Sequence, residues 1–358
     1  MYDVIVVGAG PAGSLAAKKC AEQGLGVLLL EKSALPRDKV CSGMVMGVMA
    51  QELVRQEFGE IPYESLTNPS HLAGFLLYVP ETEPQVLEYR MPFAWRRDLD
   101  FWMTQQARQA GADIRDGVKV VSVEPESGHC VVRLGQETIE SRFVIGADGA
   151  NSTIRRSIHP ELNITYRTAY RECYSGELAL DRNYFHWFAP LSRTSPRFSL
   201  CHKGEFFLLG GALKQLRSEA NKILGSYGFS GRERPIWKDG CISGAGVNLK
   251  GGLYSGAFIP ARDNILLVGD AALLQMPVSW DGIGMALKSS LHAVESIVDA
   301  LATGRDVGEI YLPRFASLLD ILKDLDLLGA RIEEAGKQGR KALAAAWADG
   351  IKAALSIA

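Results

Sequence analysis

The sequence predicts an α/β protein: a three-layer fold around a parallel sheet, an inserted, mainly antiparallel α+β portion, and a helical C-terminus. Residues 3–7 and 27–30 are short apolar runs on either side of a helical stretch, which is typical of strands buried on both faces of a parallel sheet. Residues 164–212 carry several short strand-like runs instead. Beyond residue 308, apolar side chains recur at helical spacing.

The composition is that of an ordinary globular protein. Of the 358 residues, 47% are hydrophobic and 22% are charged, which excludes disordered and fibrous architectures. The length suggests two domains, or one domain with a large insertion. Because 39 Lys and Arg residues balance 41 Asp and Glu residues, no overall positive field exists to hold a nucleic acid.

The six cysteines are scattered, with no CxxC motif and no cluster with histidine. This pattern predicts no metal site, and reduced thiols are typical of a cytoplasmic protein. The N-terminus lacks the basic start and apolar run of a signal peptide, and no uninterrupted run of 18 apolar residues predicts a membrane span. We therefore expect a cytoplasmic location.

A glycine-rich turn, Gly-Ala-Gly-Pro-Ala-Gly at residues 8–13, joins the first strand to the first helix. In such a turn the first glycine allows the sharp bend, the second lets the backbone approach a pyrophosphate, and the third lets helix and strand pack closely. The helix N-terminus adds free amide donors. Glu31, 18 residues past Gly13, is placed to accept hydrogen bonds from a ribose diol and disfavours a 2′-phosphate. The sequence thus predicts a Rossmann-type dinucleotide site, and the predicted cofactor contacts are Gly8, Gly10, Pro11, Ala12, Gly13, Glu31 and Lys32.

Two later strands favour FAD over NAD as the dinucleotide. The apolar runs 142–147 and 264–269 each end in a glycine turn that carries one carboxylate, Asp148 or Asp270. A ribityl chain offers hydroxyl donors that these carboxylates can accept, and NAD has no such chain.

With these motifs in this order, the sequence resembles the FAD-dependent oxidoreductases built like para-hydroxybenzoate hydroxylase. The resemblance implies non-covalent FAD, with Asp270 at the pyrophosphate–ribityl region and Val120 at the adenine. It also implies that the glycine amides of residues 277–286 and the following helix, 284–303, stabilise negative charge at the flavin pyrimidine edge. The further cofactor contacts implied are Arg96, Val120, Ala147, Asp148, Gly149, Gly269, Asp270, Gly282, Ile283 and Gly284.

Two segments resemble a narrower branch, the geranylgeranyl reductase family. Residues 36–44 look like its basic-plus-Cys-Gly-Gly stretch, with Ser42 replacing one glycine. Residues 184–190 resemble its aromatic Tyr-x-Trp-x-Phe-Pro strand, from which Phe185 and Ala189 depart. That branch reduces isolated C=C bonds of polyprenyl chains with reduced FAD. The resemblance implies that Cys41, Ser42 and Gly43 lie at the cofactor.

Cys41 has two interpretations. As a catalytic thiol or thiolate near the isoalloxazine it would tune the flavin or donate a proton, with Arg37 and Lys39 lowering its pKa. Alternatively, it is a small buried residue in a tight loop.

The aromatic run 184–188 predicts part of the substrate pocket. On a strand, Phe185 and Trp187 point to one face and the other three aromatics to the opposite face. Two aromatic faces need two packing partners, so one face is free to line an apolar cavity. We assign Phe185, Trp187 and Trp280 to that pocket. His186 is a weaker candidate for an acid.

The cofactor domain is predicted to be discontinuous, at 1–65, 95–157 and 240–305. The substrate-binding part is then 66–94 and 158–239, followed by a C-terminal helical segment, 306–358. Its expected strands are 72–79, 85–90, 164–180, 184–188, 197–201 and 205–212, with a helix near 213–227.

The C-terminal segment leaves two alternatives open. Pro313 can open its first helix. In the last helix Leu343, Trp347, Ile351 and Leu355 recur every four residues, which suits either packing on the body or a partner, or docking at the inner membrane face as a peripheral protein.

No second glycine fingerprint opens another βαβ unit, because residues 243–246 lack a preceding buried strand. The reductant is therefore expected to visit transiently, as NAD(P)H or a ferredoxin-like donor. The leading hypothesis is reduction of a C=C bond in an apolar, isoprenoid or lipid-like substrate. The alternatives are a flavin monooxygenase that acts through a C4a-hydroperoxide and a flavin-binding redox or scaffold protein. The oligomeric state stays open.

Overall fold

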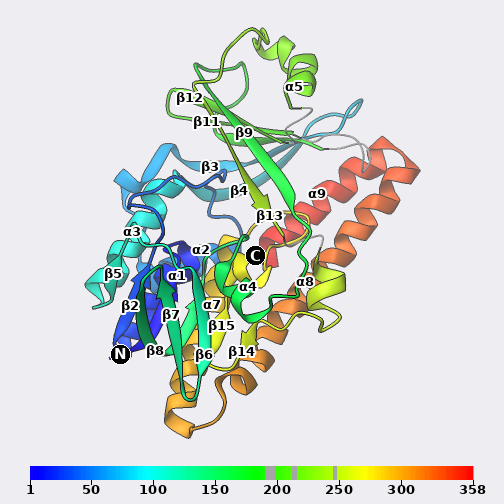
Figure 1. The fold of residues 1–358 in the computed structure, drawn as a ribbon. Helices are drawn as coiled ribbons and strands as arrows, with labels where there is room; N and C mark the ends of the chain where they lie inside the picture. Colours follow the sequence, from blue (N-terminus) through cyan, green and yellow to red (C-terminus); the bar gives the residue numbers. More distant parts are fainter. Residues whose placement is uncertain (190–197, 212–215, 245–247, 358) are drawn as a thin grey trace.

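The computed structural model describes residues 1–189, 198–211, 216–244 and 248–357, and two sheets organise them. Figure 1 shows the first sheet in the lower part of the molecule and the second sheet above it, with the two C-terminal helices running alongside both.

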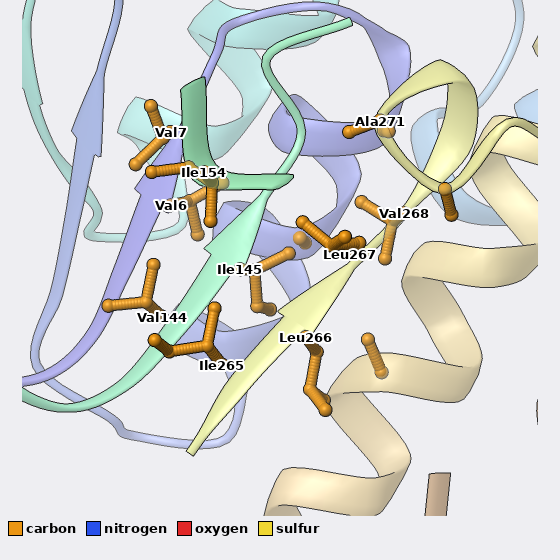
Figure 2. Packing of buried hydrophobic residues seen from close by; sticks show 14 of the residues in the cluster. Val6, Val7, Val144, Ile145, Ile154, Ile265, Leu266, Leu267, Val268 and Ala271 are labelled. Atoms are coloured by element: carbon orange, nitrogen blue, oxygen red, sulfur yellow. The ribbon is translucent and has the colours of Figure 1, made fainter. Parts of the chain in front are cut away.

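The first sheet is built on buried parallel strands. Its order is β14-β15-β8-β1-β2-β5, and β1 pairs in parallel with both β2 and β8. Because both faces of β1 and β2 are covered, their sequences are continuous apolar runs. Figure 2 shows side chains of β1, β8 and β15 packing together in this core. The strands are β1 (Tyr2–Val7), β2 (Val27–Leu30), β5 (Asp113–Arg115), β6 (Ser122–Glu126), β7 (His129–Leu134), β8 (Glu137–Gly146), β14 (Ala261–Arg262) and β15 (Ile265–Leu267).

Helices next to the first sheet bring the cofactor motifs together. Helix α1 (Pro11–Glu22) packs against α3 (Arg96–Gln109) and α7 (Ile283–Thr303), although these begin 85 and 272 residues further along the chain. Pro11 is the first residue of α1, where its missing N–H is no loss. The shorter helices α2 (Val48–Phe58) and α4 (Thr153–Ile158) complete this part.

The second sheet is mainly antiparallel, as predicted. Its order is β13-β9-β12-β11-β10-β3-β4, and only β10 and β3 run parallel. Helix α5 (Leu216–Leu224) packs against β11 and β12. The strands are β3 (Leu66–Tyr78), β4 (Gln85–Ala94), β9 (Arg167–Ser175), β10 (Tyr184–Phe188), β11 (Phe198–Lys203), β12 (Phe206–Gly211) and β13 (Trp237–Ser243).

The predicted strands fall on observed ones, with β3, β4 and β9 differing most at their ends. Residues 197 and 212–215, which the predicted strands and helix include, lie outside the described residues. Strand β13 crosses the predicted domain boundary near residue 240, and the division into domains stays a prediction.

The prediction that Pro313 opens a helix is wrong. Helix α8 spans Val307–Gln338, and Pro313 lies inside it. The helix begins earlier because the side chain of Asp306 accepts a hydrogen bond from the Glu309 amide at 3.0 Å, which caps the first turn.

The last helix, α9 (Arg340–Ile357), packs on the body. Leu343, Trp347, Ile351 and Leu355 are all buried and join a cluster with side chains of the second sheet. The Trp347 ring lies 5.8 Å from that of Trp187, centroid to centroid. This apolar face is therefore covered by protein. Among the residues that the structure describes, no helix is long and apolar enough to cross a bilayer.

Candidate flavin and substrate site

One cavity of about 2020 Å³ is lined by both sheets and by the C-terminal helices. It gathers residues from widely separated motifs of the sequence. The predicted site residues that line it are Gly8, Gly10, Pro11, Ala12, Glu31, Lys32, Cys41, Ser42, Arg96, Val120, Ala147, Asp148, Gly149, Phe185, Trp187, Gly269, Asp270, Trp280, Gly282 and Ile283. Three others, Gly13, Gly43 and Gly284, are not in its lining and pack behind it.

The glycine turn is open toward the cavity at one position and closed at two. A Cβ on Gly8 would lie 2.4 Å from the Ala147 carbonyl oxygen, and one on Gly13 would lie 1.8 Å from that of Gly8. A Cβ on Gly10 would meet only the Arg37 guanidinium, at 3.7 Å. The turn therefore packs tightly against β8 and leaves its middle glycine accessible, as a bound pyrophosphate requires.

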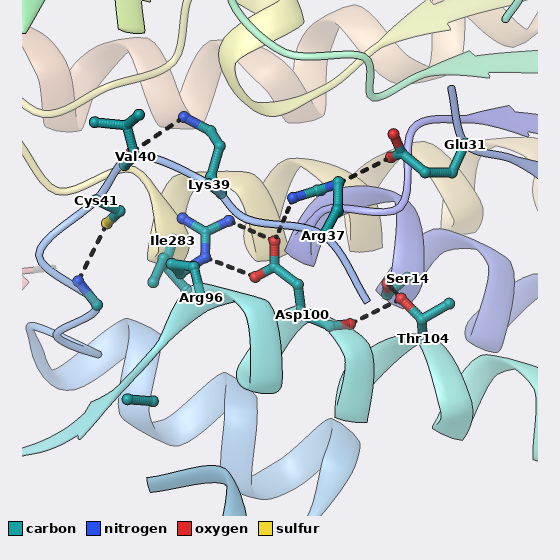
Figure 3. Close-up of polar contacts among 12 residues, drawn as sticks. Ser14, Glu31, Arg37, Lys39, Val40, Cys41, Arg96, Asp100, Thr104 and Ile283 are labelled. Carbon is teal, nitrogen blue, oxygen red and sulfur yellow. Dashed lines mark hydrogen bonds and ion pairs between the residues drawn. The ribbon is translucent and has the colours of Figure 1, made fainter. Parts of the chain in front are cut away.

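A chain of charged groups lies beside this turn (Figure 3). The Glu31 carboxylate accepts a hydrogen bond from the Ala9 amide at 2.9 Å and pairs with Arg37 at 3.2 Å. Arg37 also reaches Asp100 at 3.2 Å, and Arg96 donates to the same Asp100 carboxylate at 2.6 and 3.0 Å. Buried Asp100 thus fixes both guanidinium groups, which keeps two positive charges at the cavity wall.

Cys41 lies at that wall, with its thiol next to the Gly43 amide at 3.4 Å. Burial raises the pKa of the Cys41 thiol, but the charge of Arg96, the Gly43 amide and Lys39 together outweigh it and leave the pKa below its usual value. Of the two interpretations of Cys41, this environment suits the functional one, because it favours the thiolate.

Gly43 is required by close packing behind the wall. A Cβ there would lie 1.8 Å from the Ala94 carbonyl oxygen, and its φ is +83°. Its carbonyl oxygen accepts the Ala94 amide hydrogen bond at 2.9 Å. The Cys41 loop is therefore fastened to the end of β4.

Lys203, at the end of β11, is a buried cation next to this loop. Its ammonium donates to the Ala94 carbonyl oxygen at 2.6 Å and lies 4.3 Å from the ring centroids of both Phe93 and Trp95. Burial lowers the pKa of Lys203 to about 7.

The Asp148 carboxylate is engaged in helix capping. It accepts hydrogen bonds from the Ser152 hydroxyl at 2.5 Å and from the Thr153 and Ile154 amides at 2.5 and 3.2 Å. It therefore holds the start of α4, and its residue lines the cavity as predicted.

A buried arginine ties the two aspartate loops to each other. Arg155 donates to the carbonyl oxygens of Ala150 at 2.5 Å and Ala271 at 2.8 Å, and to the Tyr166 hydroxyl at 3.1 Å. This fixes the distance between the loop after β8 and the loop after β15 that carries Asp270. Burial raises the pKa of Asp270, and Lys39 and Arg96 oppose that rise.

The loop from Met276 to Gly282 closes the cavity in front of α7. Val278 and Trp280 adopt positive φ angles of 68° and 63°, which are rare for such residues. The Met276 amide donates to the Asp281 carbonyl oxygen at 2.8 Å, which holds the loop in this shape. Trp280, partly exposed at 37%, lines the cavity as predicted.

The other end of the cavity is mainly apolar, although α8 also lines the cavity with Asp326, Glu333 and Lys337. Phe185 and Trp187 of β10 line it together with Val278, as predicted for the two aromatics. Helices α8 and α9 complete this end with Gly329, Ile332, Gly336, Leu343 and Trp347. The opposite face of β10 packs into a separate cluster, where the His186 ring bonds the Tyr78 hydroxyl at 2.9 Å and the Asp181 carbonyl oxygen at 2.8 Å. His186 is thus a satisfied core residue.

Sequence reasoning missed Asp100, Arg155, Lys203 and the contribution of α8 and α9. Asp100 carried a signal, because it lies four residues after Arg96 on a predicted helix. The others depend on contacts between segments far apart in the chain.

The sequence is similar to those of known flavoproteins. Residues 1–176 match the FAD binding domain family. Menaquinone reductase of Mycobacterium tuberculosis is 29% identical over 91% of this chain and 83% of its own. Digeranylgeranylglycerophospholipid reductase 1 of Methanopyrus kandleri is 28% identical over 88% of this chain and 84% of its own.

Solved structures share the fold. A geranylgeranyl bacteriochlorophyll reductase-like protein of Thermoplasma acidophilum superposes with a TM-score of 0.69, at 20% identity over 99% of this chain and 88% of that chain. The halogenase PltM in complex with phloroglucinol and FAD gives 0.71, at 16% identity over 94% and 77%.

The match to the FAD binding domain family and the named relatives identify the chain as an FAD-dependent oxidoreductase. Within that class, the chain is similar to reductases of geranylgeranyl substrates, such as digeranylgeranylglycerophospholipid reductase 1 and geranylgeranyl diphosphate reductase.

Proposed function

We propose that this protein reduces a C=C bond in an apolar, isoprenoid or lipid-like chain, with reduced FAD as the hydride donor. The observation that carries the proposal is the shape of the cavity, which joins a dinucleotide-type turn to an apolar end lined by Trp187, Ile332 and Trp347. Two relatives are named for reductases of a geranylgeranylated phospholipid and of menaquinone.

In this proposal the polar end of the cavity holds the cofactor. The accessible backbone at Gly10 and the N-terminus of α1 receive the pyrophosphate, and Glu31 receives the adenosine ribose. Asp270 takes the ribityl region, and Val120 the adenine. The remaining proposed contacts are Gly8, Pro11, Ala12, Lys32, Cys41, Ser42, Arg96, Ala147, Asp148, Gly149, Gly269, Gly282 and Ile283. Gly13, Gly43 and Gly284 act from behind by allowing close packing.

The apolar end holds the chain to be reduced. Burial of each methylene group against these side chains contributes roughly 0.8 kcal/mol of binding free energy, so a long prenyl chain binds without specific polar contacts. The bound flavin supplies hydride chemistry, and the protein orients the alkene and excludes water. The surroundings of Cys41 favour its thiolate form, which would add negative charge near the flavin.

The electrons arrive from NAD(P)H or a ferredoxin-like donor that binds only transiently. Peripheral contact with a membrane would have to use a surface other than the buried face of α9.

The alternative is a flavin monooxygenase. The halogenase structures resemble this chain in fold only, so they do not favour that function. The two functions differ in their use of oxygen. A monooxygenase consumes oxygen when substrate and NAD(P)H are added, whereas an alkene reductase works under strict anaerobiosis.

The experiment is a single-turnover assay with dithionite-reduced holoenzyme and prenyl lipids under argon. Products are analysed by mass spectrometry, and we expect a gain of two hydrogen atoms per reduced bond. Unchanged lipid masses across geranylgeranyl phospholipids and menaquinone would refute the proposal. Substrate-stimulated oxygen uptake with a hydroxylated product would establish the alternative.

A further inference from the structure

The loop that closes the cavity carries a buried carboxyl group with one unused oxygen. Asp281 is 3% exposed and lines the cavity. Its Oδ1 accepts the Ile283 amide hydrogen bond at 3.1 Å. Its Oδ2 is buried and has no hydrogen-bond partner among the described residues. A buried polar atom without a partner is costly, so its position at a cavity wall points to a ligand or a proton there.

We propose that Asp281 is the general acid of the reaction: its carboxyl group donates the proton that the alkene needs in addition to the hydride. This inference rests on the proposed function and deepens it, because it assigns the second hydrogen. The loop of Asp281 lies at the start of α7, where the resemblance to the family places the pyrimidine edge of the flavin.

The step balances with reduced flavin as the two-electron donor. The π bond of the alkene breaks, one carbon forms a C–H bond with the hydride that the reduced flavin supplies, and the other carbon forms a C–H bond with the carboxyl proton of Asp281. The flavin is oxidised and the alkene is reduced. Asp281 is left as a carboxylate and regains its proton from water before the next turnover.

The surroundings of Asp281 suit both protonation states. Burial raises the pKa of Asp281 to about 6, while amides at the start of α7 and the charge of Arg96 oppose the rise. The neutral acid is therefore populated near neutral pH, and the carboxylate left after donation is stabilised by the amides and by Arg96. A general acid works best with a pKa near the operating pH.

Several elements bring charged or titratable groups near Asp281. Arg96 of α3 and the Tyr89 hydroxyl of β4 interact electrostatically with the Asp281 carboxyl group. The Oδ1 of Asp270 lies 3.5 Å from the position that a Cβ on Gly282 would take. On α8, Asp326, Glu333 and Lys337 line the same cavity.

Cys41 is the other candidate proton donor, but its surroundings favour the deprotonated form. Arg96 and the Gly43 amide favour the Cys41 thiolate and lower the pKa of the thiol, which makes its protonated form less populated. Burial raises the pKa of the Asp281 carboxyl group, whereas nearby positive charge and the Gly43 amide lower the pKa of the Cys41 thiol, so the two groups suit separate roles. Here the carboxyl group is the acid and the thiolate is a source of negative charge.

The test is the substitution Asp281→Asn, which keeps the size of the side chain and removes its acidic proton. With pre-reduced holoenzyme and a prenyl lipid, we expect flavin content and dithionite reduction to be unchanged and the single-turnover rate of alkene reduction to fall roughly 100-fold or more. In the wild type that rate should fall about tenfold per pH unit above pH 6, because the acid is lost as pH rises through its pKa. Compared with Asp281→Asn, the variant Asp281→Glu should regain part of the single-turnover rate and the decrease of that rate at high pH.

A second readout does not depend on turnover. The infrared difference spectrum between pH 5 and pH 7 should show a protonated carboxylic acid that titrates near pH 6 in the wild type and is missing in Asp281→Asn. The matched control is Asp263→Asn, an exposed residue with φ +51° in the β14–β15 turn, where asparagine fits. It should leave rate, pH profile and spectrum as in the wild type.

Each contrary outcome has a distinct meaning. If wild type and Asp281→Asn reduce alkene equally fast with the same pH profile, the role of Asp281 is refuted while the proposed function stands. If the decrease of the rate at high pH vanishes in Cys41→Ser instead, the thiol is the acid. If the wild type reduces no alkene, the proposed function fails and this role fails with it, whatever the infrared spectrum shows.

Discussion

The two ends of the cavity are built from different kinds of structure. The polar end consists of strand ends and helix starts of the first sheet, such as the Gly8–Gly13 turn and the start of α7, which are short and local in sequence. The apolar end combines β10 of the second sheet with α8 and α9, which begin more than a hundred residues later. Backbone groups dominate the first end, and side chains dominate the second.

This difference separates what each end tolerates. A backbone cradle depends on glycine at fixed positions, because an added Cβ collides with main-chain atoms that cannot move. An apolar wall depends on volume, and volume can be redistributed among neighbouring side chains. We therefore expect substitutions at the polar end to abolish cofactor binding and substitutions at the apolar end to change substrate choice.

The largest effect is expected for Gly13→Val. Its Cβ would lie 1.8 Å from the Gly8 carbonyl oxygen, so α1 must separate from the turn. We expect a loss of about 3 kcal/mol or more in the free energy of unfolding and a colourless protein. Urea unfolding and flavin absorbance measure both. Gly24→Ala, at φ +76° but in open space, is the control and should cost about 1 kcal/mol with full flavin content. A yellow, stable Gly13→Val protein would contradict the backbone-cradle view.

A smaller effect is expected for Glu31→Gln. The substitution removes the charge that accepts the Ala9 amide and pairs with Arg37. Hydrogen bonds to a charged group contribute about 1.5–3 kcal/mol, so the dissociation constant of FAD should rise roughly 10- to 100-fold. Titration of the apoprotein with FAD, followed by flavin fluorescence, measures it. Glu137→Gln, which alters an exposed ion pair in the same sheet, should leave the affinity unchanged. Equal affinities for the two variants would show that Glu31 does not hold the cofactor.

The dinucleotide-binding turn at the polar end was predictable because the residues that form it are contiguous in the sequence. The strand, glycine turn, helix and acid of residues 3–31 identify the fingerprint without any tertiary information, and the lining of the cavity includes the predicted Arg96 and Asp270. Alternation along β10 likewise predicts one face for Phe185 and Trp187, because a strand has a period of two, and both side chains line the cavity.

The rest depends on which distant surfaces meet. The apolar spacing in α8 and α9 predicts a buried face but not its partner, so the membrane and packing alternatives stayed open until the contact with β10 was known. Lys203 reads as an ordinary charged strand end, and only the rings of Phe93 and Trp95 make it a buried cation. Pro313 misled because a proline is tolerated inside a long helix that is capped upstream.

The smallest and most selective effect is expected at the apolar end, for Gly329→Leu. Gly329 lines the cavity from α8, and a Cβ there would reach only Val278, at 3.9 Å, so a leucine side chain can enter the cavity without breaking the fold. Replacing glycine inside a helix also stabilises it by about 1 kcal/mol, so lost activity would not reflect unfolding.

We expect Gly329→Leu to keep full flavin content and to lower kcat/KM roughly tenfold for the longest prenyl chains, with little change for short ones, because about two methylene groups lose their place. The matched control is Ala330→Leu, the neighbouring residue on the exposed face of α8, which should leave chain-length selectivity unchanged. If both variants lose activity equally on long and short chains, α8 does not bound the substrate site. A selective loss in Gly329→Leu alone would show that helices α8 and α9, rather than the cofactor end, determine which chains the enzyme accepts.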